Sequence, residues 1–267
     1  MCDLFSARAL AGRIAFRGGT AIHKLLFERP LRYSEDIDLV QLRPEPIGET
    51  VDAVREALAW LGKCRRRHAE HSMHLTFRFE PDAAPGTALG LKIEINTREH
   101  VSLLGVKRYP FALESSWHEG RADIASFAPE ELFGTKLRAL LQRRKGRDLF
   151  DLDEGLRRLS LDPRKLIACL EHYLALEGNP ISRAEAEERM LGKLSRSLTD
   201  DIDPLVPAGV RFSDDDAVAA FGRVWTQLIA SRRRRARRRP ESSSRCCATV
   251  SSTPSGSCAR ATRARRT

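Results

Sequence analysis

Residues 18–39 read GGTAIHKLLFERPLRYSEDIDL, and this stretch sets the expected fold. A glycine pair, Gly18-Gly19, predicts a turn, and the apolar stripe after it predicts a short helix that ends before Pro30. That stripe consists of Ala21, Ile22, Leu25 and Leu26. Apolar residues then flank two acids, Asp36 and Asp38, in a predicted strand. Because side chains two apart in a strand point to the same face, the two carboxylates should lie side by side.

The order of these residues indicates a site for a nucleoside triphosphate. Two adjacent carboxylates can hold Mg²⁺, which binds a triphosphate and assists attack on it. Gly18 and Gly19 allow phosphate to approach the backbone at the start of a helix, whose amides and dipole favour anions. The hydroxyls of Thr20 and Ser34 can add phosphate contacts. Alone, Gly-Gly is typical of a turn and Asp-x-Asp of a solvated strand end, but their order with a helix between them favours a binding site.

Two alternating stretches farther along predict neighbouring strands, at residues 73–80 and 89–96. Glu94 lies on the opposite side of its strand from Ile93 and Ile95, so it can face the same cleft as the aspartates. We therefore predict that Glu94 is a third carboxylate, which completes the Mg²⁺ site or acts as a base toward an acceptor hydroxyl. The alternative is an exposed strand glutamate that faces Lys92.

The second half of the chain is predicted to be helical. Pro129 and the two acids after it are a helix start signal. Lys145-Gly146 is expected to break or bend the helix that begins there. Helices are predicted in this half near 129–141, 149–159, 163–176, 183–198 and 214–229, and one helix is predicted earlier, in the first half, near 46–61. The expected fold is therefore α/β (α+β), with a small mixed-sheet core over residues 1–126 and a helical C-terminal domain over residues 127–231.

The net charge of +10 is concentrated at the C-terminus. Residues 232–267 hold 12 arginines and one acid, Glu241, so this segment carries +11 and the rest of the chain −1. It has no aromatic residue and too few apolar groups to form a core. We interpret it either as an arginine-rich arm for RNA or DNA or as a disordered extension, and the abrupt change after Ala230 favours the extension.

Other patterns exclude several classes of protein. The six cysteines include no CxxC spacing, so neither a zinc knuckle nor a disulfide framework is indicated. The stretch 64–74 combines Cys64 with three histidines, but it leads into the predicted strand at 73–80, where residues alternate faces, and its three arginines would crowd a metal. Arg65 to Arg67 are expected to face solvent or an RNA acceptor. No apolar run reaches 18 residues, so no membrane span is expected and the protein is interpreted as cytoplasmic.

Three motifs together resemble a known family. The arrangement of the glycines and acids is similar to that of the DNA polymerase β-like nucleotidyltransferases. GGTAIHKLLFERPLRYSEDIDL at 18–39, KIEINTRE at 92–99 and EELFGTKLRALLQRRKGRDLFDL at 130–152 resemble the successive motifs of the AbiEii toxin family. The motifs span about half of the chain, and their order makes the resemblance specific.

The resemblance implies a minimal nucleotidyltransferase core followed by a helical domain, acting as the toxin of a type IV-like toxin–antitoxin (abortive infection) system with a cognate antitoxin. It implies that Lys136 contacts the triphosphate and that Asp148 is a second essential acid. By the residues alone, Lys136 is a plausible phosphate-binding charge or a solvated helix lysine. Asp148 and Asp151 are alternatively helix-surface ion-pair partners.

The expected activity is transfer of NMP from an NTP to an acceptor with release of pyrophosphate, with Mg²⁺ as the metal. By resemblance the acceptor is the 3′ end of tRNA, and a protein hydroxyl is the second candidate. Two alternatives stay open: a non-catalytic nucleotide or nucleic-acid-binding module with an incomplete C-terminal domain, and a protein that acts through its arginine tail. Convergence of Asp36, Asp38 and Glu94 to metal-binding distance distinguishes the enzyme from the binding module.

Overall fold

The structure is a computed structural model that describes residues 1–34, 36–81, 84–116, 119–143, 145–194, 198–199 and 201–232. The chain from Met1 to Arg234 forms one compact unit. The predicted arginine arm or disordered extension covers residues 232–267. All of it except Arg232 lies outside the described residues. The division into a core (1–126) and a helical domain (127–231) stays a prediction.

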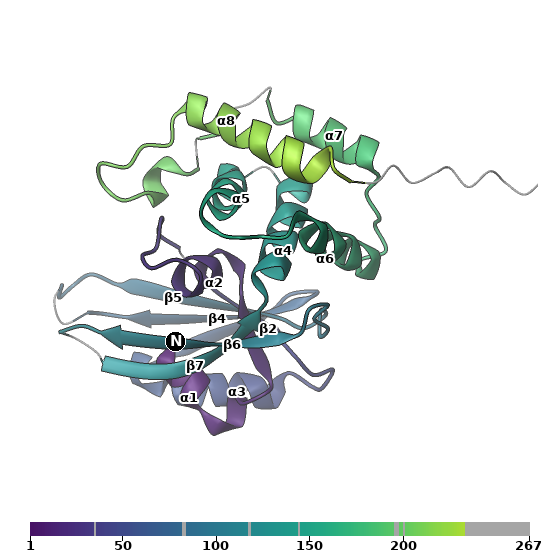
Figure 1. The fold of residues 1–267 in the computed structure, drawn as a ribbon. Helices are drawn as coiled ribbons and strands as arrows, with labels where there is room; N and C mark the ends of the chain where they lie inside the picture. The colour runs from purple at the N-terminus through teal and green to yellow at the C-terminus, as the bar shows by residue number, and fades with distance from the viewer. Residues whose placement is uncertain are drawn as a thin grey trace, which may run out of the picture. The chain divides into compact units, whose positions relative to one another are not determined.

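A mixed sheet of seven strands, in the order β3-β4-β5-β2-β1-β7-β6, is the centre of the described residues (Figure 1). The strands are β1 (Ile14–Arg17), β2 (Asp36–Gln41), β3 (Cys64–His68), β4 (Ser72–Phe79), β5 (Leu89–Asn96), β6 (Val106–Glu114) and β7 (Glu119–Phe127). β2 pairs antiparallel with β1 and parallel with β5, so the acidic strand is near the middle of the sheet. A central strand is held by hydrogen bonds on both edges, which fixes the positions of its side chains.

Helices cover both faces of the sheet, because strand side chains alternate between two apolar cores. On β2, Ile37 and Leu39 pack in one core with residues of α3 (Gly48–Ala57). Val40 packs in the other core with the C-terminal helices. Figure 1 shows α1 (Cys2–Ser6) and α3 on one side of the sheet and α2 (Gly18–Leu25) on the other.

The C-terminal helices begin and end at recognisable signals. They are α4 (Pro129–Gln142), α5 (Gly146–Arg158), α6 (Pro163–Leu176), α7 (Arg183–Leu191) and α8 (Asp214–Val224). The Asp162 carboxylate accepts hydrogen bonds from the first amides of α6, and Ser213 and Asp216 form a capping box on α8. Gly146 begins α5 where a Cβ would collide with the backbone of Leu198, so a glycine is required there.

Several elements differ from the prediction. The helix predicted over 46–61 is α3 followed by a separate 3₁₀ turn at Ala59–Leu61, and the helix predicted over 183–198 ends at Leu191. α1, β1 and the edge strands β3 and β6 had no clear signal in the sequence. β6 contains Pro110 and is mostly exposed, as an edge strand permits, so it lacks the alternation that reveals a half-buried strand.

The predicted mixed-sheet α+β fold with C-terminal helices is confirmed. Among the described residues, no helix has the length and apolar character needed to cross a membrane.

Candidate active site

The glycine pair joins β1 directly to α2 and forms one wall of a cleft. Gly18 is the first residue of α2 and has φ +79, a conformation that other residues rarely adopt. A Cβ on Gly18 would collide with the Asp38 carboxylate, so the glycine allows this acid to lie against the helix N-terminus. The predicted turn is thus the first turn of the helix itself, whose first amides have no acceptor within the helix.

Two hydroxyl residues flank this wall. Thr20 donates from Oγ1 to the Asp36 carbonyl oxygen at 2.6 Å, so its hydroxyl fastens α2 to β2. Ser34 accepts a 3.4 Å hydrogen bond from Arg32. Both residues line a pocket of about 280 Å³ together with Gly19. The hydroxyl proton of Thr20 is already committed, which leaves its oxygen only as an acceptor.

The three predicted carboxylates lie on neighbouring strands and line the same pocket. Asp38 pairs in register with Glu94 across β2 and β5, and Asp36 pairs with Lys92. Burial raises the pKa of Asp38 above its ordinary value, Glu94 and Asp36 act in the same direction, and Lys136 opposes them. Among the described residues, no hydrogen bond or ion pair engages the Asp38 carboxylate. An added cation would favour the charged form of the Asp38 carboxylate and so lower its pKa.

Lys92, which the sequence suggested only as a partner for an exposed Glu94, lies among these carboxylates. Its Nζ is 3.2 Å from Asp36 Oδ2 and 3.6 Å from Glu94 Oε2. The expected convergence of Asp36, Asp38 and Glu94 on one metal is not found: no group of three acidic, histidine or cysteine side chains in the described ranges could hold a metal ion. Mg²⁺, however, binds to one or two carboxylates plus substrate phosphates and water, so the donor set fits a metal that arrives with a nucleotide.

Lys136 on α4 faces the carboxylates from the other side of the cleft. Its Nζ is 3.1 Å from Asp148 Oδ1 and 2.9 Å from Asp151 Oδ2, and both acids lie on α5. Both acids are fully buried, so the alternative that they form helix-surface pairs is wrong, as is the alternative of a solvated Lys136. They fix Lys136 where it lines the pocket, while neither acid lines the pocket itself.

Asp151 is the centre of a buried ion network that the sequence did not reveal. It contacts His23 Nε2 at 2.8 Å and accepts two 2.7 Å hydrogen bonds from Arg32. Burial acts to raise the pKa of Asp151, but Lys136, Arg32 and His23 hold it well below its ordinary range. The network therefore joins α2, the loop after it, α4 and α5.

Asp148 plays a similar part for Arg143, which follows α4. The Arg143 guanidinium donates two hydrogen bonds to Asp148, at 2.7 and 2.8 Å. Burial acts to raise the pKa of Asp148, but Lys136 and Arg143 lower it below its ordinary value. Arg143 also lines the cleft, which makes it a second phosphate-binding candidate that the motifs did not identify.

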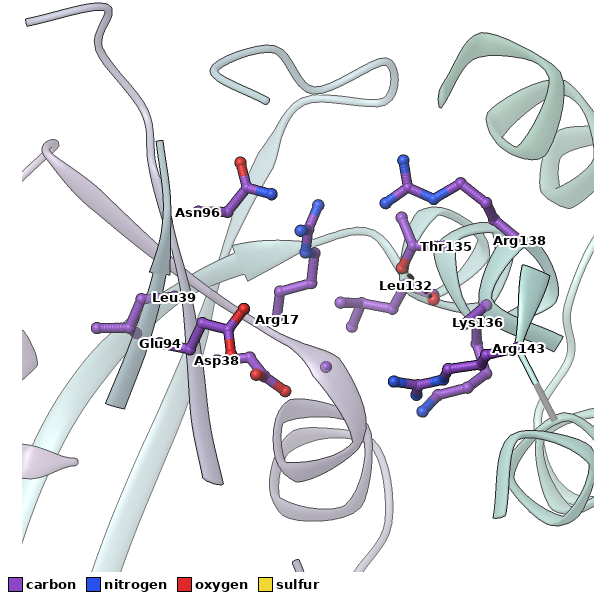
Figure 2. Close-up of a pocket in the computed structure, with 12 residues that line it drawn as sticks. Arg17, Asp38, Leu39, Glu94, Asn96, Leu132, Thr135, Lys136, Arg138 and Arg143 are labelled. Carbon is purple, nitrogen blue, oxygen red and sulfur yellow. Dashed lines mark hydrogen bonds between the residues drawn. The ribbon is translucent and has the colours of Figure 1, made fainter. Parts of the chain in front are cut away.

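The cleft has two connected hollows, which share Asp38, Glu94, Lys136 and Arg143. Figure 2 shows Asp38 and Glu94 on the sheet side of the smaller hollow, of about 180 Å³, with Lys136 and Arg143 opposite them. Gly18 lines the smaller hollow, whereas Gly19 and Thr20 line the larger one, of about 280 Å³. Acids therefore face cations across a gap, an arrangement suited to a metal-bound polyphosphate.

Comparison with known proteins decides the family. A family model described as "Nucleotidyl transferase AbiEii toxin, Type IV TA system" matches residues 1–225. The chain belongs to the AbiEii family. The predicted resemblance is confirmed, and the chain is a nucleotidyltransferase of a family of type IV toxin–antitoxin toxins.

Two solved structures are similar to this AbiEii-family chain. The nucleotidyltransferase toxin MenT4 from Mycobacterium tuberculosis H37Rv has 17% identity and a TM-score of 0.61, covering 86% of this chain and 81% of its own. JHP933 from Helicobacter pylori has 17% identity and a TM-score of 0.52, covering 83% of this chain and 86% of its own. At these identities the likeness concerns the fold. No curated protein matches the chain.

Another buried carboxylate of this AbiEii-family chain, Glu99, lies behind the smaller hollow and holds two arginines that line it. Glu99 is paired with Arg17 and accepts a 2.6 Å hydrogen bond from Arg138. Burial acts to raise the pKa of Glu99, but Arg17 and Arg138 lower it from 4.5 to about 2. Both arginines line the smaller hollow, so Glu99 sets their positions without touching it.

The Glu99 pairing predicts a pH dependence of stability. A carboxyl with a lowered folded-state pKa stabilises the fold fully above its unfolded pKa, and the stabilisation is lost as pH falls from 4.5 toward 2. Glu99→Gln should lower the free energy of unfolding by roughly 3 kcal/mol at pH 7, and the difference from wild type should shrink between pH 4.5 and 3. Urea unfolding at several pH values measures it. Glu49→Gln, which removes an exposed partner of Arg13, should change stability by less than about 0.5 kcal/mol. An equal loss at pH 7 and pH 3 would contradict the prediction.

Proposed function

We propose that this chain is a cytoplasmic Mg²⁺-dependent enzyme that transfers NMP from an NTP to the 3′-hydroxyl of tRNA, and that a cognate antitoxin restrains it. The observation that carries the proposal is the cleft in which Asp36, Asp38 and Glu94 face Lys136 and Arg143. The glycine wall offers helix amides to phosphate, and the acids offer oxygen ligands to Mg²⁺. Together the amides and the acids suit a complex of Mg²⁺ with a triphosphate better than they suit a free metal ion or a free triphosphate.

In this mechanism the acceptor oxygen attacks the α-phosphorus, a new P–O bond forms, and the bond to the β-phosphate oxygen breaks. Pyrophosphate leaves with the electron pair of that bond. Asp36 and Asp38 would hold Mg²⁺, which when bound neutralises charge that develops on the phosphates. Glu94 is beside Asp38 and is assigned to accept the proton of the attacking hydroxyl.

The cations across the cleft bind the triphosphate. Lys136 and Arg143 supply positive charge to the non-bridging and leaving oxygens, where charge accumulates in the transition state. The amides of Gly19 and Thr20 and the hydroxyl of Ser34 are assigned to hold the phosphates on the opposite side. Asp148 acts through its contacts with Lys136 and Arg143, so we assign it as a positioning residue.

The test is a transfer assay with the purified full chain, each of the four α-³²P-labelled NTPs, Mg²⁺ and total tRNA. We expect label on RNA with at least one NTP, and none when EDTA replaces Mg²⁺. Periodate-oxidised tRNA, which lacks the terminal diol, is the matched control and should accept no label. Label on protein in the absence of RNA would instead identify a protein hydroxyl as acceptor. No label on either would favour a non-catalytic binding module.

A further inference from the structure

A row of side chains crosses five strands on the face that bears the cleft. The register pairs Arg17 with Asp38, Asp38 with Glu94, Glu94 with His74, and His74 with Arg67. Paired residues on neighbouring strands point to the same face of a sheet. The row therefore begins in the smaller hollow, passes the carboxylates, and ends at the edge strand β3.

A parallel row lies one step along the strands. It runs from Asp36 to Lys92, then to Thr76 on β4, and ends at Arg65 on β3. Arg65 and Arg67 are exposed, whereas the residues nearer the cleft are half-buried. The face thus changes from acidic at β2 to basic at β3 while remaining polar throughout.

The arginines at the outer end are not neutralised by the protein. No ion pair among the described residues involves Arg65 or Arg67. Arg67 Nη2 is 3.1 Å from His74 Nδ1, and His74 Nε2 is 3.5 Å from Glu94 Oε2. Direct contacts therefore lead from the edge arginine to the carboxylate of the cleft.

We propose that this polar face, made of Arg65, Arg67, His74 and Thr76, binds the phosphodiester backbone of the single-stranded 3′ end of the acceptor nucleic acid. The proposal rests on the proposed function, because it assigns the path by which an acceptor hydroxyl reaches Glu94. Two strand spacings, roughly 10 Å, separate β5 from β3. A chain whose terminal hydroxyl is at Glu94 therefore passes over both arginines with its final phosphates.

The chemistry of this face favours a polyanion over a protein segment. Its exposed end offers guanidinium groups, which bind phosphate in a bidentate manner, and no apolar side chain projects from this face at the four positions. Cationic contacts with phosphate release counterions, so the binding they provide must weaken with salt. A protein partner would instead require an apolar centre to its interface.

The matched variants come from one strand. Arg65→Ser with Arg67→Ser removes both charges from the cleft face. Arg66→Ser removes one charge from the opposite face, where its register partner is the buried core residue Leu75. We expect the double variant to raise the KM for tRNA about 10-fold at 150 mM salt, with kcat and the KM for NTP changed less than about 2-fold. Its log KM against log salt should be shallower by about 1.4. Arg66→Ser should behave as wild type.

An activity-independent measurement separates this proposal from the proposed function. A single-stranded RNA with 4-thiouridine beside its 3′ end is photocrosslinked to the full chain, and the attached peptides are mapped. Crosslinks within residues 64–78 support the proposal even if wild type transfers no nucleotide, a result that would sink the proposed function alone. Crosslinks confined to residues 233–267, or an Arg66→Ser effect as large as that of the double variant, would overturn the proposal.

Discussion

Asp38→Asn is expected to lower the rate of nucleotide transfer by about 10²–10³-fold without weakening the fold. Asp38 is the acid that burial and neighbouring carboxylates disturb most in the cleft, and these effects raise its pKa. A group whose folded pKa is raised in this way opposes folding once the pH exceeds its unfolded value. An uncharged amide of similar size removes that opposition, so the free energy of unfolding without divalent metal should stay the same or rise.

Two measurements check this expectation on the same preparation. The first is the transfer rate at saturating NTP, and the second is urea unfolding with and without Mg²⁺–NTP. Wild type should be stabilised by Mg²⁺–NTP, whereas Asp38→Asn should lose most of that stabilisation because ligand binding to the native state alone shifts the equilibrium. Asp52→Asn, an exposed acid on α3, is the control and should retain the wild-type rate. A variant that keeps more than a tenth of the rate would show that the Asp38 carboxylate is not required.

Asp151→Ala is expected to cost about 3–5 kcal/mol of folding free energy, the largest loss predicted for any single substitution here. The reason is that the polar side chains in contact with this acid are themselves buried: Arg32, His23 and Lys136. Removing the acid leaves the desolvated Arg32 guanidinium without its ion-pair partner, and Lys136 keeps only Asp148, which is far more costly than losing a solvated pair. Activity should fall as well, because Lys136 loses one of its two anchors.

The matched control is Asp52→Ala, which breaks an exposed ion pair with Arg55 on a helix. That change should cost less than about 0.5 kcal/mol, because solvent screens the pair. Urea unfolding at pH 7 measures both variants under the same conditions. A loss below about 1 kcal/mol for Asp151→Ala would mean that the buried cluster does not depend on this acid.

The parts of the site that lie close together in the chain could be predicted from the sequence. Gly18, Asp36 and Asp38 fall within one stretch, and the period-2 rule correctly put Glu94 on the face opposite Ile93 and Ile95. The strands β4 and β5 and the start of α6 were predicted because their patterning is local. Which residues carry out catalysis stays a prediction.

The parts that depend on distant residues could not be predicted. Arg32 and His23 carry no local signal of burial, since their partner Asp151 is more than a hundred residues away. Arg143 is one of three consecutive basic residues in the sequence, and only its contact with Asp148 gives its guanidinium a fixed position. Lys92 was considered only in the alternative of an exposed Glu94 that faces it, but it contacts Asp36 on the adjacent strand as well as Glu94.

The strand order has a consequence for synthesis of this chain on the ribosome. β1 is made near the start, yet it lies between β2 and β7, and β7 ends at Phe127. The anchors of Lys136 are made later still, at Asp148 and Asp151. A nascent chain that has emerged only as far as β5 therefore has its acids and glycines without the cations opposite them. Such a chain holds no assembled cleft, because more than half of the sequence must be translated before both anchors of Lys136 are present.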